Sequence, residues 1–147
     1  MHGDADRRNL LFRRNAAGEE ELVAIDWVFA GLSVMGADVQ NLVVSAVAFS
    51  QIDAAEIGML GEVAYDGYLR GIVEAGWRGD ERPIRLGYAA SSALIWGIVL
   101  CGTLMSRLRN QQPRKREIVD ITMMVLEYEL QLAEEAKALI AGLSASA

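Results

Sequence analysis

The chain has 147 residues, of which 52% are hydrophobic and 23% charged, and its formal net charge is -6. This length and composition allow one domain and exclude a disordered, collagen-like or disulfide-stapled chain. Residues 19–66 hold nine carboxylates and neither lysine nor arginine, so this stretch would repel a nucleic-acid backbone. We therefore expect no nucleic-acid partner.

The first third of the chain predicts a β-hairpin. A short apolar run at residues 9–12 and a β-prone run at residues 22–25 flank a turn signal at residues 15–18, which contains Asn15 and Gly18. After Gly36 the pattern changes from strand and turn signals to helical spacing.

Four helices are expected after the hairpin. Apolar residues recur at helical spacing in four stretches, at about residues 37–51, 53–76, 83–109 and 114–143. Asp53 is placed to cap the second helix, and Pro83 falls in the first turn of the third. The sequence therefore predicts an α+β fold that is mostly helical.

The third predicted helix raises the question of a membrane span. Residues 86–105 are twenty residues without a charge, between Arg85 and Arg107. A run of this length can cross a bilayer core of about 30 Å. Much of it is Gly, Ala, Ser, Thr and Tyr, however, which favours a buried core helix over a membrane span.

The chain shows no sign of export. Residues 1–9 are polar, whereas a secretory signal has a basic start and then an apolar run. Cys101 is the only cysteine, which excludes an intramolecular disulfide and favours a reducing compartment. We therefore expect a cytoplasmic protein.

Two acidic positions bracket the predicted hairpin. Residues 2–9 read His-Gly-Asp-Ala-Asp-Arg-Arg-Asn, which has the form H-x-D-x-x-x-x-N, and Asp26 follows the second apolar run. In such a loop the carboxylate accepts a hydroxyl proton, and the amide oxygen five residues later holds a divalent cation. Phosphoryl transfer divides its work in this way, because Mg²⁺ bridges the phosphates while the acceptor hydroxyl is aligned on the phosphorus.

These motifs, taken in order along residues 2–38, resemble the aminoglycoside phosphotransferase family. Its relatives include choline-kinase-like and homoserine-kinase-like enzymes, all with the protein-kinase-like fold. The resemblance is carried by His2-Gly3-Asp4 with Asn9, by Ile25-Asp26-Trp27, by Phe29-Ala30-Gly31 and by Asp38. Residues 39–147 match the family only in their general helical character.

The resemblance implies a role for each matching residue. It implies that Asp4 is the catalytic base, that Asn9 and Asp26 bind Mg²⁺, and that Asp38 hydrogen-bonds and supports the catalytic loop. His2 is expected to pack and to hydrogen-bond backbone rather than to act as an acid or base. The resemblance further implies ATP as phosphoryl donor, Mg²⁺ as cofactor and a hydroxyl of a small molecule as acceptor.

Residues 6–8 depart from the family pattern, which often has an aromatic residue or histidine, then proline and glycine, between the aspartate and the asparagine. Arg7 or Arg8 can contact a transferring phosphate, because a planar guanidinium suits phosphate oxygens. Pairing of either arginine with Asp6 or another nearby carboxylate is an equally good interpretation. Asp6 itself is expected to be a solvated loop carboxylate rather than an extra metal ligand.

Two other groups of residues have both a functional and a structural interpretation. Carboxylates in and before the second predicted helix suit a cationic, amine-rich acceptor and equally suit a solvated helix face; they are Asp53, Glu56, Glu62 and Asp66. Trp27 and Phe29 are expected to lie in the core rather than in a cofactor site.

A kinase of this kind also has a glycine-rich loop and a strand lysine before its catalytic loop. Here only Met1 precedes His2, and both lysines lie in the last predicted helix. We therefore expect residues 1–147 to be a single partial domain, the C-terminal lobe of a protein-kinase-like fold, with poor activity alone. Apolar surface left uncovered is expected to favour self-association. The alternative of another class is a non-catalytic helical remnant, or a membrane-associated protein that uses residues 86–105.

Overall fold

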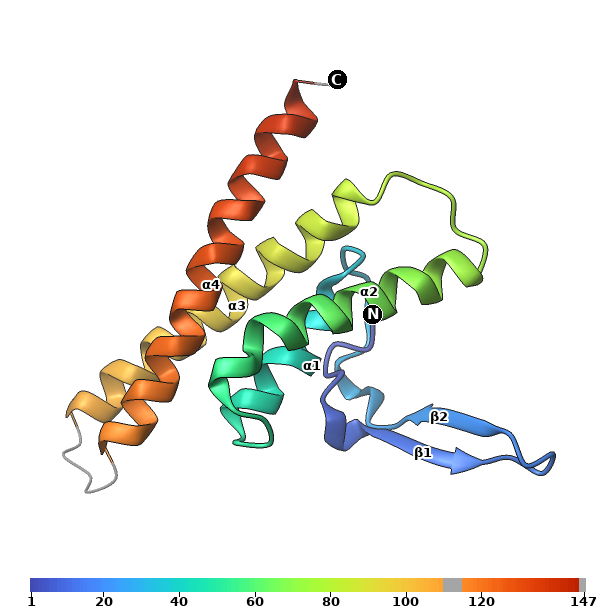
Figure 1. Cartoon of the computed structure of the whole chain (residues 1–147), viewed down its shortest axis with the longest axis horizontal. Helices are drawn as coiled ribbons and strands as arrows, with labels where there is room; N and C mark the ends of the chain where they lie inside the picture. Colours follow the sequence, from blue (N-terminus) through green and yellow to red (C-terminus); the bar gives the residue numbers. More distant parts are fainter. Residues whose placement is uncertain (110–114, 146–147) are drawn as a thin grey trace.

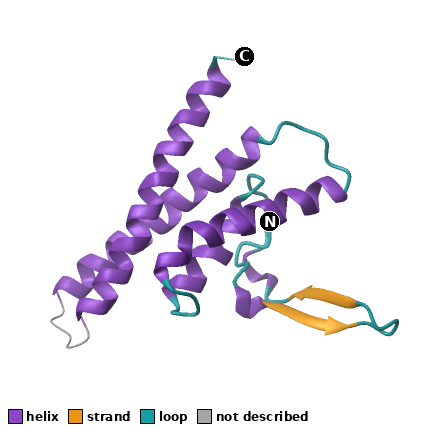
Figure 2. Cartoon of the chain, viewed as in Figure 1, coloured by secondary structure: helices purple, strands orange, loops and turns teal. Residues whose placement is uncertain are grey.

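The structure is a computed structural model that describes residues 1–109 and 115–145, without the side chains of residues 115 and 116. An antiparallel hairpin precedes four α-helices in these residues, which confirms the expected α+β, mostly helical fold (Figures 1 and 2). The strands are β1 (Leu10–Arg14) and β2 (Glu20–Ala24). The helices are α1 (Ala37–Ala48), α2 (Ile57–Glu74), α3 (Arg82–Arg109) and α4 (Lys115–Ser144), and the short 3₁₀ turns are η1 (Arg7–Asn9), η2 (Trp27–Phe29) and η3 (Ala54–Glu56).

The hairpin forms where the turn signal predicts it. The side chain of Asn15 accepts hydrogen bonds from the backbone nitrogens of Ala17 and Glu19, both at 3.0 Å, which closes the turn between the strands. The register pairs Leu10 with Ala24. Beyond this pair the hairpin extends away from the helices (Figure 1), and the hydrophobic core contains no side chain of β1 or β2.

The helices begin close to the predicted positions. Asp53 accepts a hydrogen bond from the backbone nitrogen of Ala55 at 3.0 Å, so it caps η3, which leads directly into α2. Pro83 lies in the first turn of α3, where a missing backbone N–H costs nothing. The predicted end of this helix at residues 110–113 lies outside the described residues.

The core lies between α1, α3 and α4, with α2 packed across α1. α3 and α4 lie side by side over much of their length, and the C-terminal part of α4 extends beyond the other helices (Figure 1). The most deeply buried side chains of the core are mainly β-branched and aromatic: Val43, Val44, Val47, Ile84, Tyr88 and Val125.

Polar groups are buried between α3 and α4. The hydroxyls of Tyr88 and Tyr128 hydrogen-bond to each other, and Ser92 donates to Glu129 Oε1 at 3.0 Å. Glu129 is only 3% exposed. Burial raises its pKa to about 7, and the hydrogen bond from Ser92 offsets only part of that effect.

Burial corrects two expectations from the sequence. Trp27 and Phe29 are not core residues, because they are 57% and 66% exposed. The apolar run of α3 is buried on one face only, so the expected core helix is also half uncovered. Among the described helices α3 is long and apolar enough to cross a bilayer, and 17% of its most apolar window is buried inside the protein.

Candidate catalytic loop

Residues 2–9 form a loop that is hydrogen-bonded to the start of α1. Asp38, in the first turn of α1, accepts hydrogen bonds from the backbone nitrogens of His2 at 2.9 Å and Gly3 at 3.0 Å. Gly3 has a φ of +82°, and a Cβ there would lie 2.2 Å from the carbonyl oxygen of Phe29. Only glycine therefore fits this turn without strain.

His2 is buried under the loop. Its Nε2 donates to the carbonyl oxygen of Ile25 at 2.8 Å, and its Nδ1 accepts from the backbone nitrogen of Asp4 at 3.3 Å. A single neutral tautomer, protonated at Nε2, makes both hydrogen bonds. The ring also packs on Trp27, with the centroids 4.5 Å apart. These contacts give His2 a structural role and leave neither ring nitrogen for proton transfer.

Asp4 and Asn9 face each other across the loop. Asn9 Nδ2 donates to both the carbonyl oxygen and Oδ2 of Asp4, each at 3.0 Å. No described residue donates a hydrogen bond to Asn9 Oδ1, so this oxygen is available as a ligand. The pair presents a carboxylate and an amide oxygen from one short loop.

The hairpin register places Asp26 at the same end of the hairpin as Asn9. The backbone nitrogen of Ile25 donates to the carbonyl oxygen of Asn9 at 2.9 Å, which extends the strand pairing by one residue at this end. Asp26 follows directly, in the left-handed conformation with φ of 60°, which aspartate tolerates better than most residues. Its carboxylate is exposed and accepts no hydrogen bond from the described residues. Asn9 and Asp26 therefore lie at the same end of the hairpin, opposite its turn.

The donor set at this end of the hairpin fits a magnesium ion. Amide and carboxylate oxygens are hard ligands, and Mg²⁺ is commonly held by one or two protein oxygens together with substrate phosphates and water. The described residues contain no group of three or more His, Cys, Asp or Glu side chains arranged for a metal. The remaining ligands of a cation at Asn9 and Asp26 would therefore have to come from a phosphate-bearing substrate and from water.

Asp6 is not the solvated carboxylate that the sequence predicts. It is 2% exposed, and its Oδ1 accepts from the backbone nitrogen of Arg8 at 2.8 Å and from the Arg8 side-chain Nε at 2.7 Å. Burial alone would raise the pKa of Asp6, but interactions with Arg8 and Ser45 outweigh it and hold the pKa below its ordinary value. Asp6 is the N-cap of η1, since its side chain accepts from the backbone nitrogen two residues later.

The two loop arginines differ. Arg8 is occupied, because it pairs with Asp6 and its guanidinium lies 4.1 Å from the ring centroid of Phe49. Arg7 is exposed, and none of the described carboxylates forms a salt bridge with it. Of the two predicted phosphate contacts, only Arg7 is free to reach a ligand.

Sequence analysis missed Asn41. Its Nδ2 donates to the carbonyl oxygen of Gly3 at 3.0 Å, and its Oδ1 accepts from Nε1 of Trp96 at 3.2 Å. Asn41 thus ties the loop to α3 as well as to α1. The available signal is its position three residues after Asp38, which puts both side chains on one face of α1.

The carboxylates near α2 lie in other surroundings. Asp53 caps η3, and Glu62 pairs with Arg85 at 2.7 Å. Glu62 and Asp66 line an open cleft of about 430 Å³ between α2, α3 and α4, and none of residues 2–9 lines it. The structure therefore does not join these carboxylates to the loop of Asp4.

The comparisons with known proteins add no relative. No family model, curated protein or solved structure matches the chain. The functional interpretation therefore depends on the residues themselves and on the contacts described above.

Proposed function

We propose that this chain carries the catalytic loop and the metal-binding hairpin of a phosphotransferase, which moves a phosphoryl group from ATP to a hydroxyl of a small molecule. The observation that carries the proposal is the position of Asn9. Its side chain holds Asp4 on one side, and its backbone pairs with the residue before Asp26 on the other.

Each residue has a separate task in this proposal. Asp4 accepts the proton of the acceptor hydroxyl, and the Asn9 amide fixes the direction of its carboxylate. The Asn9 amide oxygen and the Asp26 carboxylate hold Mg²⁺, which when bound neutralises phosphate charge. Asp38 and Asn41 position the loop without touching the substrate.

Arg7 is the residue that we assign to the phosphates, because Arg8 is already paired with the buried Asp6. A free guanidinium offers a planar set of donors to phosphate oxygens. Lys115 and Lys137 both lie in α4, outside the loop and hairpin. The proposal therefore requires a nucleotide-covering lobe from elsewhere for turnover.

Metal binding tests the proposal without a complete enzyme. Mn²⁺ is the probe, and electron paramagnetic resonance measures its free fraction with and without ATP. We expect Asp26→Asn to weaken Mn²⁺ binding by about tenfold, since a charged oxygen ligand is lost. Asp66→Asn is the matched control and should bind like the wild type, because Asp66 lies in α2 and lines a different cleft. Equal Mn²⁺ affinity in wild type and Asp26→Asn would contradict the metal assignment.

Activity tests the role of Asp4 once a nucleotide-binding lobe is supplied. Removing a general base typically lowers the rate by about 10²–10⁴-fold. We expect a loss of this size in kcat for Asp4→Ala, with Mn²⁺ affinity preserved. Unchanged turnover by Asp4→Ala would exclude it as the base.

A further inference from the structure

A pocket lies between the end of α1 and the facing sides of α3 and α4. Its volume is about 290 Å³, close to the lower limit of the range of about 300–1,000 Å³ that small-molecule sites occupy. Residues 48–50 line it, together with side chains of α3 between residues 96 and 107 and of α4 between residues 118 and 125. None of residues 2–9 lines it, so this pocket is separate from the candidate catalytic loop.

The inner wall of this pocket is apolar. Leu100 and Val125 line it and belong to the hydrophobic core. Trp96 and Ile121, both half-buried, also line it and pack against the same core. The indole N–H of Trp96 already donates to Asn41 Oδ1. The inner wall therefore offers a ligand apolar contact.

Two threonines in the lining add no free donor. The hydroxyl of Thr103 donates to the carbonyl oxygen of Val99 at 2.9 Å, and that of Thr122 donates to the carbonyl oxygen of Ile118 at 2.7 Å. The described residues that line the pocket hold no buried polar side-chain atom without a partner. A wholly polar ligand would therefore find few partners inside.

The rim of the pocket is basic. Arg107, which is exposed and lies in the last turn of α3, is the charged residue of the described lining, and no aspartate or glutamate lines the pocket. Arg107 forms no salt bridge with a described carboxylate. Residues 106–116 hold five arginines and lysines and no carboxylate, although the whole chain has a net charge of -6. An anion is therefore favoured at this rim.

We propose that this pocket binds a monocarboxylate with a medium-length alkyl chain. The carboxylate pairs with Arg107 at the rim, and the chain lies against Leu100 and Val125 on the inner wall. The two ends of the pocket together select this ligand class. A cation would be repelled by Arg107, phosphate would leave the apolar wall unused, and a neutral hydrocarbon would leave the guanidinium without a partner. The site does not depend on the phosphotransferase proposal.

The size of the pocket sets the expected chain length and affinity. A volume near the lower limit for ligand sites fits a short single chain such as that of octanoate. A ligand of this size is expected to bind with a Kd of about a millimolar. Each methylene that enters the pocket tightens binding by up to about fourfold, so hexanoate should bind about tenfold more weakly than octanoate.

Nuclear magnetic resonance of the full chain tests the site with octanoate itself. The indole N–H signal of Trp96 should shift as octanoate is added, because Trp96 lines the pocket. The indole signal of Trp27, which lies on η2 outside the pocket, should stay in place. Octylammonium, which has the same chain length and the opposite charge, should not shift the Trp96 signal.

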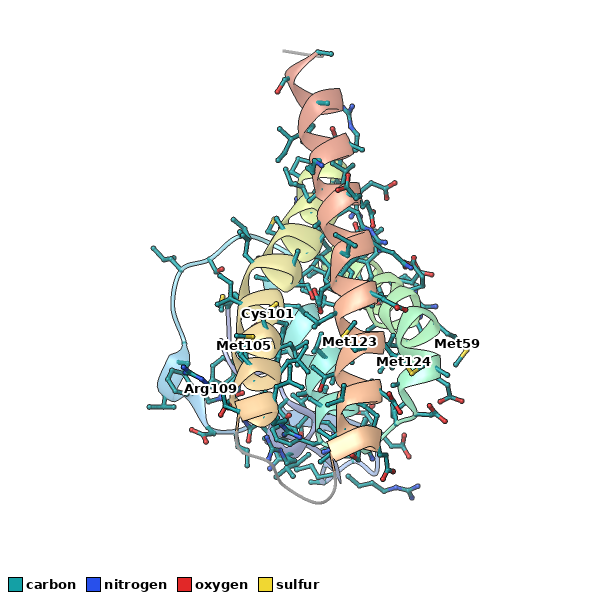
Figure 3. All side chains as sticks on the ribbon, turned by 90° about the vertical axis from the view of Figure 1, so that its left-hand side faces the viewer. Met59, Cys101, Met105, Arg109, Met123 and Met124 are labelled. Carbon is teal, nitrogen blue, oxygen red and sulfur yellow. The ribbon has the colours of Figure 1, made fainter. Side chains whose placement is uncertain are left out.

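Two arginines give a matched pair of variants. Arg107→Gln should weaken octanoate binding by about tenfold or more, because a charge-assisted hydrogen bond is lost. Arg109→Gln makes the same change in charge on the same turn. Figure 3 shows Arg109 at the end of α3 on the side away from α4, and it does not line the pocket, so its variant should stay within about twofold of the wild type.

A third variant fills the pocket without removing charge. Ala48→Leu enlarges a lining side chain at the exposed end of α1 and should also weaken octanoate binding by about tenfold. Circular dichroism should show all three variants to be as helical as the wild type, since the three residues are exposed.

Several results would overturn the proposal. One is a Trp96 signal that stays fixed at roughly ten times the expected Kd of octanoate. Another is an equal affinity in the wild type and Arg107→Gln, or an equal loss in Arg107→Gln and Arg109→Gln, which would reduce the effect to general attraction of anions. Binding to phosphatidylglycerol vesicles without binding to monomeric octanoate would assign the basic rim to a membrane surface and also overturn it.

Discussion

The carboxylate of Asp38 accepts a hydrogen bond from the backbone nitrogen of Gly3 at 3.0 Å, although 35 residues separate them in the sequence. Its other oxygen accepts from His2 at 2.9 Å, so one side chain holds two consecutive backbone donors. Hydrogen bonds to a charged group are stronger than those between neutral groups. This contact joins the candidate catalytic loop to the start of α1.

Replacing Asp38 should therefore destabilise the protein. Asp38→Ala leaves two partly buried N–H groups without their acceptor, and we expect a loss of about 1.5–3 kcal/mol in the free energy of unfolding. Urea denaturation measures the loss, and hydrogen exchange at the Gly3 amide should become faster. Asp66→Ala, an exposed aspartate on α2, is the control and should change neither. Unchanged exchange at Gly3 in Asp38→Ala would contradict the contact.

Gly3 and Gly18 form a matched pair. Both have positive φ, at +82° and +84°, but a Cβ at Gly3 would strike Phe29 while a Cβ at Gly18 would meet nothing within 4 Å. Gly18→Ala should cost about 1–2 kcal/mol for the left-handed conformation alone. Gly3→Ala should cost more, because the loop must also move. Thermal unfolding of both variants measures the difference in stability. An equal loss of stability in the two variants would show that the loop at Gly3 moves without cost to make room for the Cβ.

Replacing the two neighbouring arginines, Arg7 and Arg8, should affect stability differently. Arg8→Ala removes the partner of the buried Asp6 carboxylate, so we expect a lower midpoint of urea unfolding. The midpoint should fall more above pH 5 than at pH 3, because Asp6 is charged at the higher pH and would then lack its partner. Arg7→Ala should leave the midpoint unchanged, since the described part of the chain gives Arg7 no salt bridge. A fall of equal size in both variants would argue against a specific pairing of Asp6 with Arg8.

Glu129 should make stability depend on pH. Its pKa is raised to about 7 in the folded protein by burial, against an ordinary value of 4.5, so the folded state keeps its proton longer than the unfolded state does. Stability from this group is fully present below pH 4.5 and is lost as the pH rises toward 7. This group should lower the free energy of unfolding by about 3 kcal/mol across this pH window.

Comparison of variants isolates this effect from the other titrating groups. Glu129→Gln cannot titrate, so its stability relative to the wild type should rise between pH 5 and pH 8. Glu127→Gln, on the exposed side of α4, should follow the wild type across the same range. A constant difference between Glu129→Gln and wild type over the whole range would rule out the shifted pKa.

Local structure follows from the sequence because its causes are local. Asn15 closes the hairpin turn with hydrogen bonds to residues two and four positions away, and Asp53 caps its turn from two positions away. The order of hairpin and helices is therefore readable from spacing and turn residues. Asp4 and Asn9 are similarly close, so a contact between them follows from the loop motif itself.

The sequence by itself determined the hairpin, the four helices and the short loop that presents Asp4 and Asn9. Only the tertiary structure decided which apolar residues are covered, because hydrophobicity does not say which neighbour a side chain will have. Trp27 and Phe29 are exposed, Asp6 is buried, and α3 keeps one apolar face uncovered for this reason. The role of Asn41 also depends on the tertiary structure, since its contacts with Gly3 and Trp96 form only when three distant segments pack together.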